Sequence, residues 1–234
     1  MSKKILLKVS GEMFSNSDGS SFDFAKYSAV AKNLVEFVEV NNAGLALVVG
    51  AGNIWRYRDT TGAGLGRVEA DQLGMVATVF NAKLLEGAIN NAGGRAMAMT
   101  AFDVPGLLPS YDFTVAKSIV EDGGIVILAG GTGNPFFTTD SCAVLRALEL
   151  DLDMLVKATK VDGVYDADPV KNPKAKKYET VSYDEVLEKS LQVMDLPAIS
   201  LARDNNLPIL VFDYSDPENL LKVMKNFKLG TLVS

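Results

Sequence analysis

Histidine is absent from this sequence of 234 residues, and cysteine occurs only once, at Cys142. Without histidine the chain has no imidazole to act as a catalytic base, as a member of a Ser-His-Asp triad or as a metal ligand. A single cysteine forms no internal disulfide and no cysteine metal cluster, which favours a reducing compartment. We expect Cys142 to be a small buried apolar residue.

Long apolar runs and excess positive charge are also lacking. No stretch approaches the roughly 18 apolar residues of a membrane span, and the first apolar run is too short for a secretory signal. We therefore expect a cytoplasmic protein with no membrane segment. The formal net charge of −6 provides no overall positive field for nucleic acid or an anionic membrane. Any phosphate group must be bound by a local cluster of side chains.

The composition, 48% hydrophobic and 22% charged, is typical of a folded globular protein. Short apolar runs alternate with segments of helical periodicity, which predicts an α/β fold with a largely parallel sheet. The length fits one domain, interpreted as two lobes. The expected strands are Ile5–Val9, Leu45–Val49, Arg95–Met99, Ile125–Ala129, Met154–Val156 and Pro208–Phe212. The expected helices are Asp23–Asn41, Val68–Asn90, Tyr111–Glu121, Thr139–Leu150, Tyr183–Ser190, Pro197–Asn205 and Pro217–Asn226.

The longest expected helix has an apolar stripe. The residues expected to line one face of it are Val68, Met75, Val76, Val79, Phe80, Leu84 and Ile89.

Unusual residues follow four expected strands, and ligands of open parallel sheets bind at the carboxyl ends of strands. Lys8–Glu12 (KVSGE) places a lysine before a turn of small residues, where its ammonium group suits a phosphate in transfer. An ordinary edge lysine is the alternative.

Gly50–Asn53 (GAGN) exposes backbone N–H groups that bind phosphate oxygens, and Arg56 lies nearby. A glycine turn without a ligand is the alternative.

The third and fourth loops are richer in polar groups. Gly130–Asp140 (GGTGNPFFTTD) leads into a helix whose N-terminus suits an anion, although helix capping alone is the alternative. In Lys157–Pro169 (KATKVDGVYDADP) either Lys157 or Lys160 would meet phosphate, while a solvated charged hairpin is the alternative. Asp71 either stabilises a helix start or accepts hydrogen bonds from a ribose.

Several nucleotide-binding motifs are missing: there is no GxxxxGK[ST], no GxGxxG after the first strand and no protein-kinase catalytic motif. Phosphoryl transfer nevertheless fits the residues that are present. Its loose transition state needs positioned cations and N–H donors, and it requires neither histidine nor a covalent nucleophile.

Four of these motifs together, KVSGE, VVGAGN (Val48–Asn53), GTGNPFFTTD and KATKVDGVYDADP, resemble the bacterial-type UMP kinases of the amino acid kinase superfamily. The resemblance continues through Val193–Ile209 and covers essentially the whole chain. It implies a three-layer αβα sandwich around a mainly parallel sheet, and transfer of the ATP γ-phosphoryl group to UMP in pyrimidine biosynthesis. UMP would bind the lobe of about residues 1–150 and MgATP the lobe of about 151–234. A homohexamer with GTP and UTP as effectors is also implied.

The resemblance assigns roles by matching motifs. The implied catalytic residues are Lys8, Arg56, Asp140 and Lys157, with Asp140 orienting the two lysines. ATP would be bound by Lys8, Val9, Ser10, Gly11, Gly52, Arg56, Thr159, Tyr165 and Asp168. UMP would be bound by Ala51, Asp71, Thr132, Gly133, Asn134, Pro135, Phe136, Phe137, Thr138 and Thr139. Mg²⁺ is expected on the nucleotide phosphates, without a protein ligand.

Three features depart from the pattern of that family: Ala51 replaces a glycine, and the segments Phe14–Phe22 and Arg58–Arg67 are atypical. Ala51 is tolerated if its φ is negative. Other functions remain open on the same fold, namely phosphorylation of acetylglutamate, glutamate or carbamate, non-catalytic binding of a nucleotide or oxyanion, and regulation of transcription. GTGNPFFTTD argues against the first, Lys8 and Arg56 against the second, and the acidic charge against the third.

Overall fold

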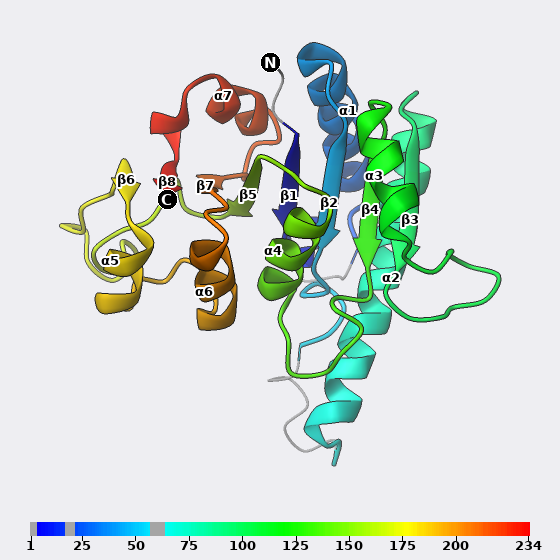
Figure 1. Ribbon diagram of the computed structural model, residues 1–234, viewed down its shortest axis with the longest axis horizontal. Helices are drawn as coiled ribbons and strands as arrows, with labels where there is room; N and C mark the ends of the chain where they lie inside the picture. The colour runs from blue at the N-terminus through cyan, green and yellow to red at the C-terminus, as the bar shows by residue number, and fades with distance from the viewer. Residues whose placement is uncertain (1–3, 17–21, 57–63) are drawn as a thin grey trace.

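The computed structural model describes residues 4–16, 22–56 and 64–234. Within these ranges eight strands form one sheet in the order β3-β4-β2-β1-β5-β7-β8-β6 (Figure 1). Among these strands every neighbouring pair is parallel except β7 and β8. The strands are β1 (Ile5–Val9), β2 (Leu45–Val49), β3 (Ala96–Thr100), β4 (Ile125–Ala129), β5 (Met154–Thr159), β6 (Thr180–Val181), β7 (Ile209–Asp213) and β8 (Thr231–Val233).

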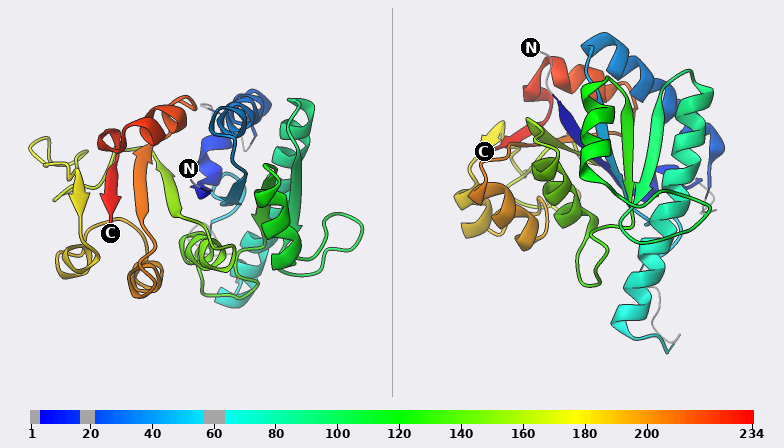
Figure 2. Two further views of the ribbon diagram at one scale, coloured as in Figure 1. Left: turned by 45° about the horizontal axis from the view of Figure 1, so that its top comes forward. Right: turned by 45° about the vertical axis from the view of Figure 1, so that its right-hand side comes forward.

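Helices cover both faces of the sheet (Figure 2). One layer holds α1 (Phe24–Asn41), α2 (Arg67–Asn91) and α7 (Asn219–Lys225). The other holds α3 (Phe113–Glu121), α4 (Thr139–Glu149), α5 (Tyr183–Glu188) and α6 (Leu196–Asp204). Short 3₁₀ helices, η1 (Gly11–Phe14) and η3 (Phe227–Leu229), complete the chain. The three-layer αβα architecture is confirmed.

The central strands supply side chains to two cores because successive residues point to opposite faces. In β1, Ile5, Leu7 and Val9 pack under α1, α2 and α7, whereas Leu6 packs under α4. The central strands β2 and β4 are buried along their whole length, which explains why their sequences are unbroken apolar runs. Asp23 is the N-cap of α1 and Asp112 is the N-cap of α3, and each carboxylate accepts from backbone N–H groups of the first turn.

The expected strands and helices are all present, with small shifts at their ends. Two strands were missed: β6 has 2 residues and β8 has 3, too short to show an alternating pattern. Cys142 is fully buried, as expected, and burial raises the pKa of its thiol to about 11.

The prediction of which residues form the buried apolar face of α2 is wrong. Val79 and Ile89 are buried, but Val76 is 54% exposed and Phe80 is 49% exposed. The buried face instead includes the polar residues Thr78 and Asn81. The spacing of apolar residues along the helix could not identify the buried face, because two of the buried residues are polar.

The two interpreted lobes contribute β1–β4 and β5–β8, and they meet where β1 pairs with β5. Residues 17–21 of the atypical segment Phe14–Phe22, and residues 58–63 of the segment Arg58–Arg67, lie outside the described ranges. Among the described residues, no helix has both the length and the apolarity to cross a membrane.

Candidate active site

The carboxyl ends of β4, β2, β1 and β5 are neighbours in the sheet, and they bring the four unusual loops together. Lys8 of β1 and Lys157 of β5 are register partners on adjacent strands. Asp140, in the first turn of α4, lies between them, with Oδ1 2.7 Å from Lys8 Nζ and Oδ2 2.7 Å from Lys157 Nζ. Lys157 also donates to the carbonyl oxygen of Val193. Asp140 therefore contacts both lysines, and its expected role in orienting them stays a prediction.

The electrostatics of this cluster follow from burial and from opposite charges held close together. Burial alone would raise the pKa of Asp140, but Lys8 and Lys157 outweigh it and hold that pKa below its ordinary value. Burial lowers the pKa of Lys157, and Asp140 opposes the shift without cancelling it. Two lysines and one carboxylate leave a net positive charge, which suits a phosphoryl group in transfer.

The start of α4 is held by Asp195, a residue that the sequence alone did not identify. Thr138 caps α4 by accepting from the backbone N–H groups of Asp140 and Ser141. Its hydroxyl donates to Asp195 at 2.6 Å, and the Ser141 hydroxyl donates to the same carboxylate at 3.0 Å. Asp195 is also the N-cap of α6. One carboxylate therefore links the starts of two helices beside the charged cluster.

The loops after β1 and β2 pack directly against each other. A β-carbon at Gly11 would lie 2.6 Å from the carbonyl oxygen of Gly50 and 2.7 Å from the amide nitrogen of Gly52. Gly11 is therefore required for the packing of these two loops, whatever its part in binding a phosphate. The φ of Ala51 is not positive, so its methyl group is tolerated, as expected.

A buried polar network behind the β2 loop was also missed. The Tyr27 hydroxyl donates to Asn81 Oδ1 at 2.7 Å, and Asn81 Nδ2 donates to the carbonyl oxygen of Gly50 and to Asn53 Oδ1, each at 2.8 Å. Burial raises the pKa of Tyr27 to about 12, so the phenol remains a donor at physiological pH. The network anchors the loop Gly50–Asn53 to α1 and α2.

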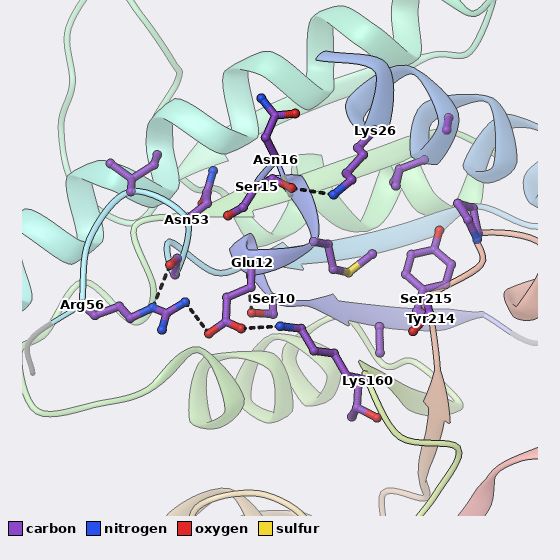
Figure 3. Close-up of a pocket in the computed structure, with 18 of the residues that line it drawn as sticks. Ser10, Glu12, Ser15, Asn16, Lys26, Asn53, Arg56, Lys160, Tyr214 and Ser215 are labelled. Atoms are coloured by element: carbon purple, nitrogen blue, oxygen red, sulfur yellow. Dashed lines mark hydrogen bonds and ion pairs between the residues drawn. The ribbon is translucent and has the colours of Figure 1, made fainter. Parts of the chain in front are cut away.

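A large cavity of about 1070 Å³ opens beside these loops (Figure 3). It is lined by four residues expected to bind ATP, namely Ser10, Gly52, Arg56 and Thr159. Lys160 lines it as well, together with Tyr214 and Ser215, which follow β7 and were not expected. In Figure 3, Arg56 and Lys160 approach Glu12 from opposite sides.

Other residues expected to bind ATP do not line this cavity. Val9 is fully buried in the core. Tyr165 donates its hydroxyl to Asp162 at 2.6 Å, and Asp168 accepts from the backbone N–H of Val170. Lys8 and Gly11 do not line the cavity either. The roles of all the expected residues in ATP binding stay predictions.

A second cavity, of about 150 Å³, is lined by five of the residues expected to bind UMP: Ala51, Asp71, Asn134, Phe137 and Thr139. Residues that the sequence did not assign to UMP complete the lining, namely Trp55, Ala70, Gly74, Met75, Thr78 and Gly131. Trp55 lines both cavities, so the two cavities adjoin.

Asp71 organises the loop beside the smaller cavity. Its Oδ2 accepts from Arg67 Nε at 2.7 Å and from the backbone N–H of Phe136 at 2.8 Å. Phe136 has a φ of 70°, a left-handed conformation that this hydrogen bond stabilises. The remaining residues expected to bind UMP, which do not line the cavity, are Thr132, Gly133, Pro135, Phe136 and Thr138.

Residues 3–213 match the amino acid kinase family model. The chain belongs to the amino acid kinase family. A uridylate kinase from Magnetococcus marinus is 47% identical over 236 residues, which cover 99% of this chain and 95% of that protein. The uridylate kinase of Escherichia coli K12 is 44% identical over 232 residues, covering 99% and 96% of the two chains. The crystal structure of UMP kinase from Ureaplasma parvum is 33% identical, with a TM-score of 0.94 and coverage of 100% and 99%.

The charged cluster of this amino acid kinase is adjacent in sequence to residues that line the two cavities. Asp140 directly follows Thr139, which lines the smaller cavity. Lys157 directly precedes the segment Ala158–Val161, which lines the larger cavity. The cluster of Lys8, Asp140 and Lys157 therefore lies beside residues of both cavities.

Proposed function

We propose that this amino acid kinase transfers the γ-phosphoryl group of ATP to UMP, giving ADP and UDP, as a step of pyrimidine nucleotide biosynthesis. The observation that carries the proposal is the Lys8–Asp140–Lys157 cluster, which is adjacent in sequence to residues that line the two adjoining cavities. Two relatives that are 47% and 44% identical to this chain are named uridylate kinases, which supports UMP as the acceptor.

In the proposed reaction an α-phosphate oxygen of UMP forms a bond to the γ-phosphorus of ATP. The bond from that phosphorus to the β,γ-bridging oxygen breaks, and ADP leaves with the electron pair. Lys8, Lys157 and Arg56 stabilise the charge on the transferring oxygens, and Asp140 holds the two lysines in position. The attacking oxygen is already anionic, so no general base is needed.

The larger cavity is proposed to take ATP. Lys8, Ser10, Gly11, Gly52 and Arg56 would meet its phosphates. Thr159, Tyr165 and Asp168 would hold its adenosine part.

The smaller cavity is proposed to take UMP, with the loop of residues 132–139 around it. Asp71 would accept from the ribose hydroxyls, while its Oδ2 accepts from Arg67 and from the backbone N–H of Phe136.

Mg²⁺ is proposed as the cofactor that accompanies ATP. Among the described residues no group of three or more acidic or cysteine side chains is placed to hold a metal ion. Both oxygens of Asp140 are already paired with lysines. This donor set fits a magnesium ion carried mainly by the nucleotide phosphates and water, where it would neutralise charge on the β- and γ-phosphates.

A cytoplasmic homohexamer with GTP and UTP as effectors is proposed as the working form. Exposed apolar residues on α2, including Leu73, Val76 and Phe80, support self-association. The N-terminal half of α2 projects from the body of the molecule, where a second copy can reach it (Figure 2).

The test is coupled ADP release with MgATP and each of UMP, CMP, AMP, GMP, N-acetylglutamate and glutamate. Turnover with UMP, lost in Lys8→Ala and weakened in Asp71→Asn, is the expected result. Turnover with only an amino acid would assign the chain to another reaction of the family. ATP binding without turnover on any acceptor would contradict a catalytic function.

A further inference from the structure

Glu12 joins two cations of the large cavity: Arg56, which the proposed function assigns to the ATP phosphates, and Lys160. Its Oε1 is 2.7 Å from Arg56 Nη2, and its Oε2 is 2.9 Å from Lys160 Nζ (Figure 3). All three side chains line the large cavity. The carboxylate therefore bridges the cavity from the loop after β2 to the loop after β5.

The backbone around Glu12 is shaped to admit this side chain. A β-carbon at Gly52 would lie 3.1 Å from Glu12 Cγ and 3.7 Å from Arg56 Nε. Arg56 Nε donates to the carbonyl oxygen of Gly52 at 2.8 Å, which leaves Nη2 for the carboxylate. The glutamate thus lies across the bare backbone of the loop expected to bind phosphate.

A carboxylate and a phosphate compete for the same donors, because both offer paired oxygens to guanidinium and ammonium groups. With Glu12 in place the three side chains sum to one positive charge, and without its contacts Arg56 and Lys160 present two. The side chains of Glu12 and Arg56 are each 31% exposed and that of Lys160 is 73% exposed. Solvent screening makes such pairs weak, so an incoming polyphosphate can replace them at little cost.

We propose that Glu12 is a positioning residue that holds Arg56 and Lys160 across the empty cavity and releases them to the ATP polyphosphate. This inference rests on the proposed binding of ATP in the large cavity. In the free protein Glu12 offsets the repulsion between the two cations and keeps them near the phosphate loop. Glu12 acts through Arg56 and Lys160 and does not touch the reacting atoms.

The proposal predicts that Glu12→Gln tightens ATP binding, since the amide keeps the shape of the side chain but removes the competing charge. We expect the Kd for ATP to fall about three- to tenfold, the range for two partly exposed ion pairs. The Kd for UMP and kcat should each stay within about twofold. The fluorescence of Trp55, the single tryptophan, reports both titrations because Trp55 lines both cavities.

Glu36→Gln is the matched control, because it removes the same charge from an exposed position on α1. It should leave the Kd for ATP unchanged. Lys160→Gln provides a second measurement: combined with Glu12→Gln it should reduce the gain in ATP affinity, because one of the two contested cations is then missing.

A Kd for ATP that is unchanged or higher in Glu12→Gln would overturn the proposal, and would mean that the Glu12 contacts persist when ATP is bound. An equal gain in affinity with and without Lys160 would overturn the bridging role. Failure of the wild-type protein to bind ATP would count against the proposed function itself. That failure is distinct, because the wild-type titration detects it before any variant is compared.

Discussion

Lys8 and Lys157 are register partners on adjacent parallel strands, and they remain side by side because Asp140 gives one carboxylate oxygen to each. Two like charges on neighbouring strands repel unless an anion lies between them. The N-terminus of α4 supplies that anion. A candidate site for a transferring phosphoryl group is thereby assembled from two strands and one helix that are distant in sequence.

We expect Asp140→Asn to lower the free energy of unfolding by about 3 kcal/mol at pH 7, because it leaves two largely buried lysines without their counter-ion. Urea unfolding would measure the change. Asp151→Asn is the control: Asp151 forms an exposed pair with Lys117 at 3.5 Å, and its replacement should cost less than about 0.5 kcal/mol. Equal losses in the two variants would contradict the role assigned to the cluster.

The difference in stability between wild type and Asp140→Asn should depend on pH. The pKa of Asp140 is lowered in the folded state, so the stabilisation is fully present above the unfolded carboxyl pKa of about 3.9. It should decline as the pH falls through the lower pKa of the folded state. Urea unfolding between pH 3 and pH 7 would show this, and a difference that grows toward low pH would have the wrong sign.

The network behind the β2 loop predicts unequal effects for its members. Asn81→Ala should cost about 2–3 kcal/mol and reduce kcat, because it leaves the Gly50 carbonyl and the Tyr27 hydroxyl without their partner. Tyr27→Phe should cost only about 1 kcal/mol, since Asn53 still donates to Asn81 Oδ1. Thermal unfolding and steady-state kinetics would measure both variants. A larger loss in Tyr27→Phe would contradict the central place given to Asn81.

Loss of the hydrogen bond between Thr138 and Asp195 should weaken binding of the acceptor UMP more than binding of ATP. Thr138→Val removes the hydroxyl that caps α4 and donates to Asp195, so we expect the KM for UMP to rise about tenfold, with a smaller change for ATP. Thr138→Ser keeps the hydroxyl and should remain near wild type. If the serine variant lost as much as the valine variant, the hydroxyl would not be the group that matters.

The exposed apolar residues of α2 should be needed for self-association. Val76→Glu places a charge among them and should shift the protein toward smaller assemblies in analytical ultracentrifugation. Lys83→Gln changes a polar position on the same helix and should not alter the assembly. An unchanged mass in Val76→Glu would place the contact between copies elsewhere on the surface.

Residues next to the ends of apolar strands were the most predictable part of the site. Lys8, Gly52 and Asp140 stand in short motifs whose local pattern marks a strand end, a glycine turn or a helix start, so they could be identified without knowing the tertiary structure. Glycines with positive φ after β4, Gly130 and Gly131, follow the same logic because only glycine adopts that conformation readily.

Residues that depend on distant partners could not be predicted in this way. Tyr27 and Asn81 are 54 positions apart, and Thr138 and Asp195 are 57 positions apart. Nothing in the local pattern of Asn81 distinguishes a buried anchor from a solvated surface residue. The buried face of α2 was predicted wrongly for the same reason.

The sequence by itself determined the alternation of strands and helices, the absence of histidine chemistry and the four loops that carry the site. These are local properties of composition, periodicity and turn residues. Only the tertiary structure decided that Asp140 lies between two lysines, that Glu12 bridges Arg56 and Lys160, and that Val76 and Phe80 face outward. Those relationships depend on strand order and helix packing, which bring together side chains that no local pattern connects.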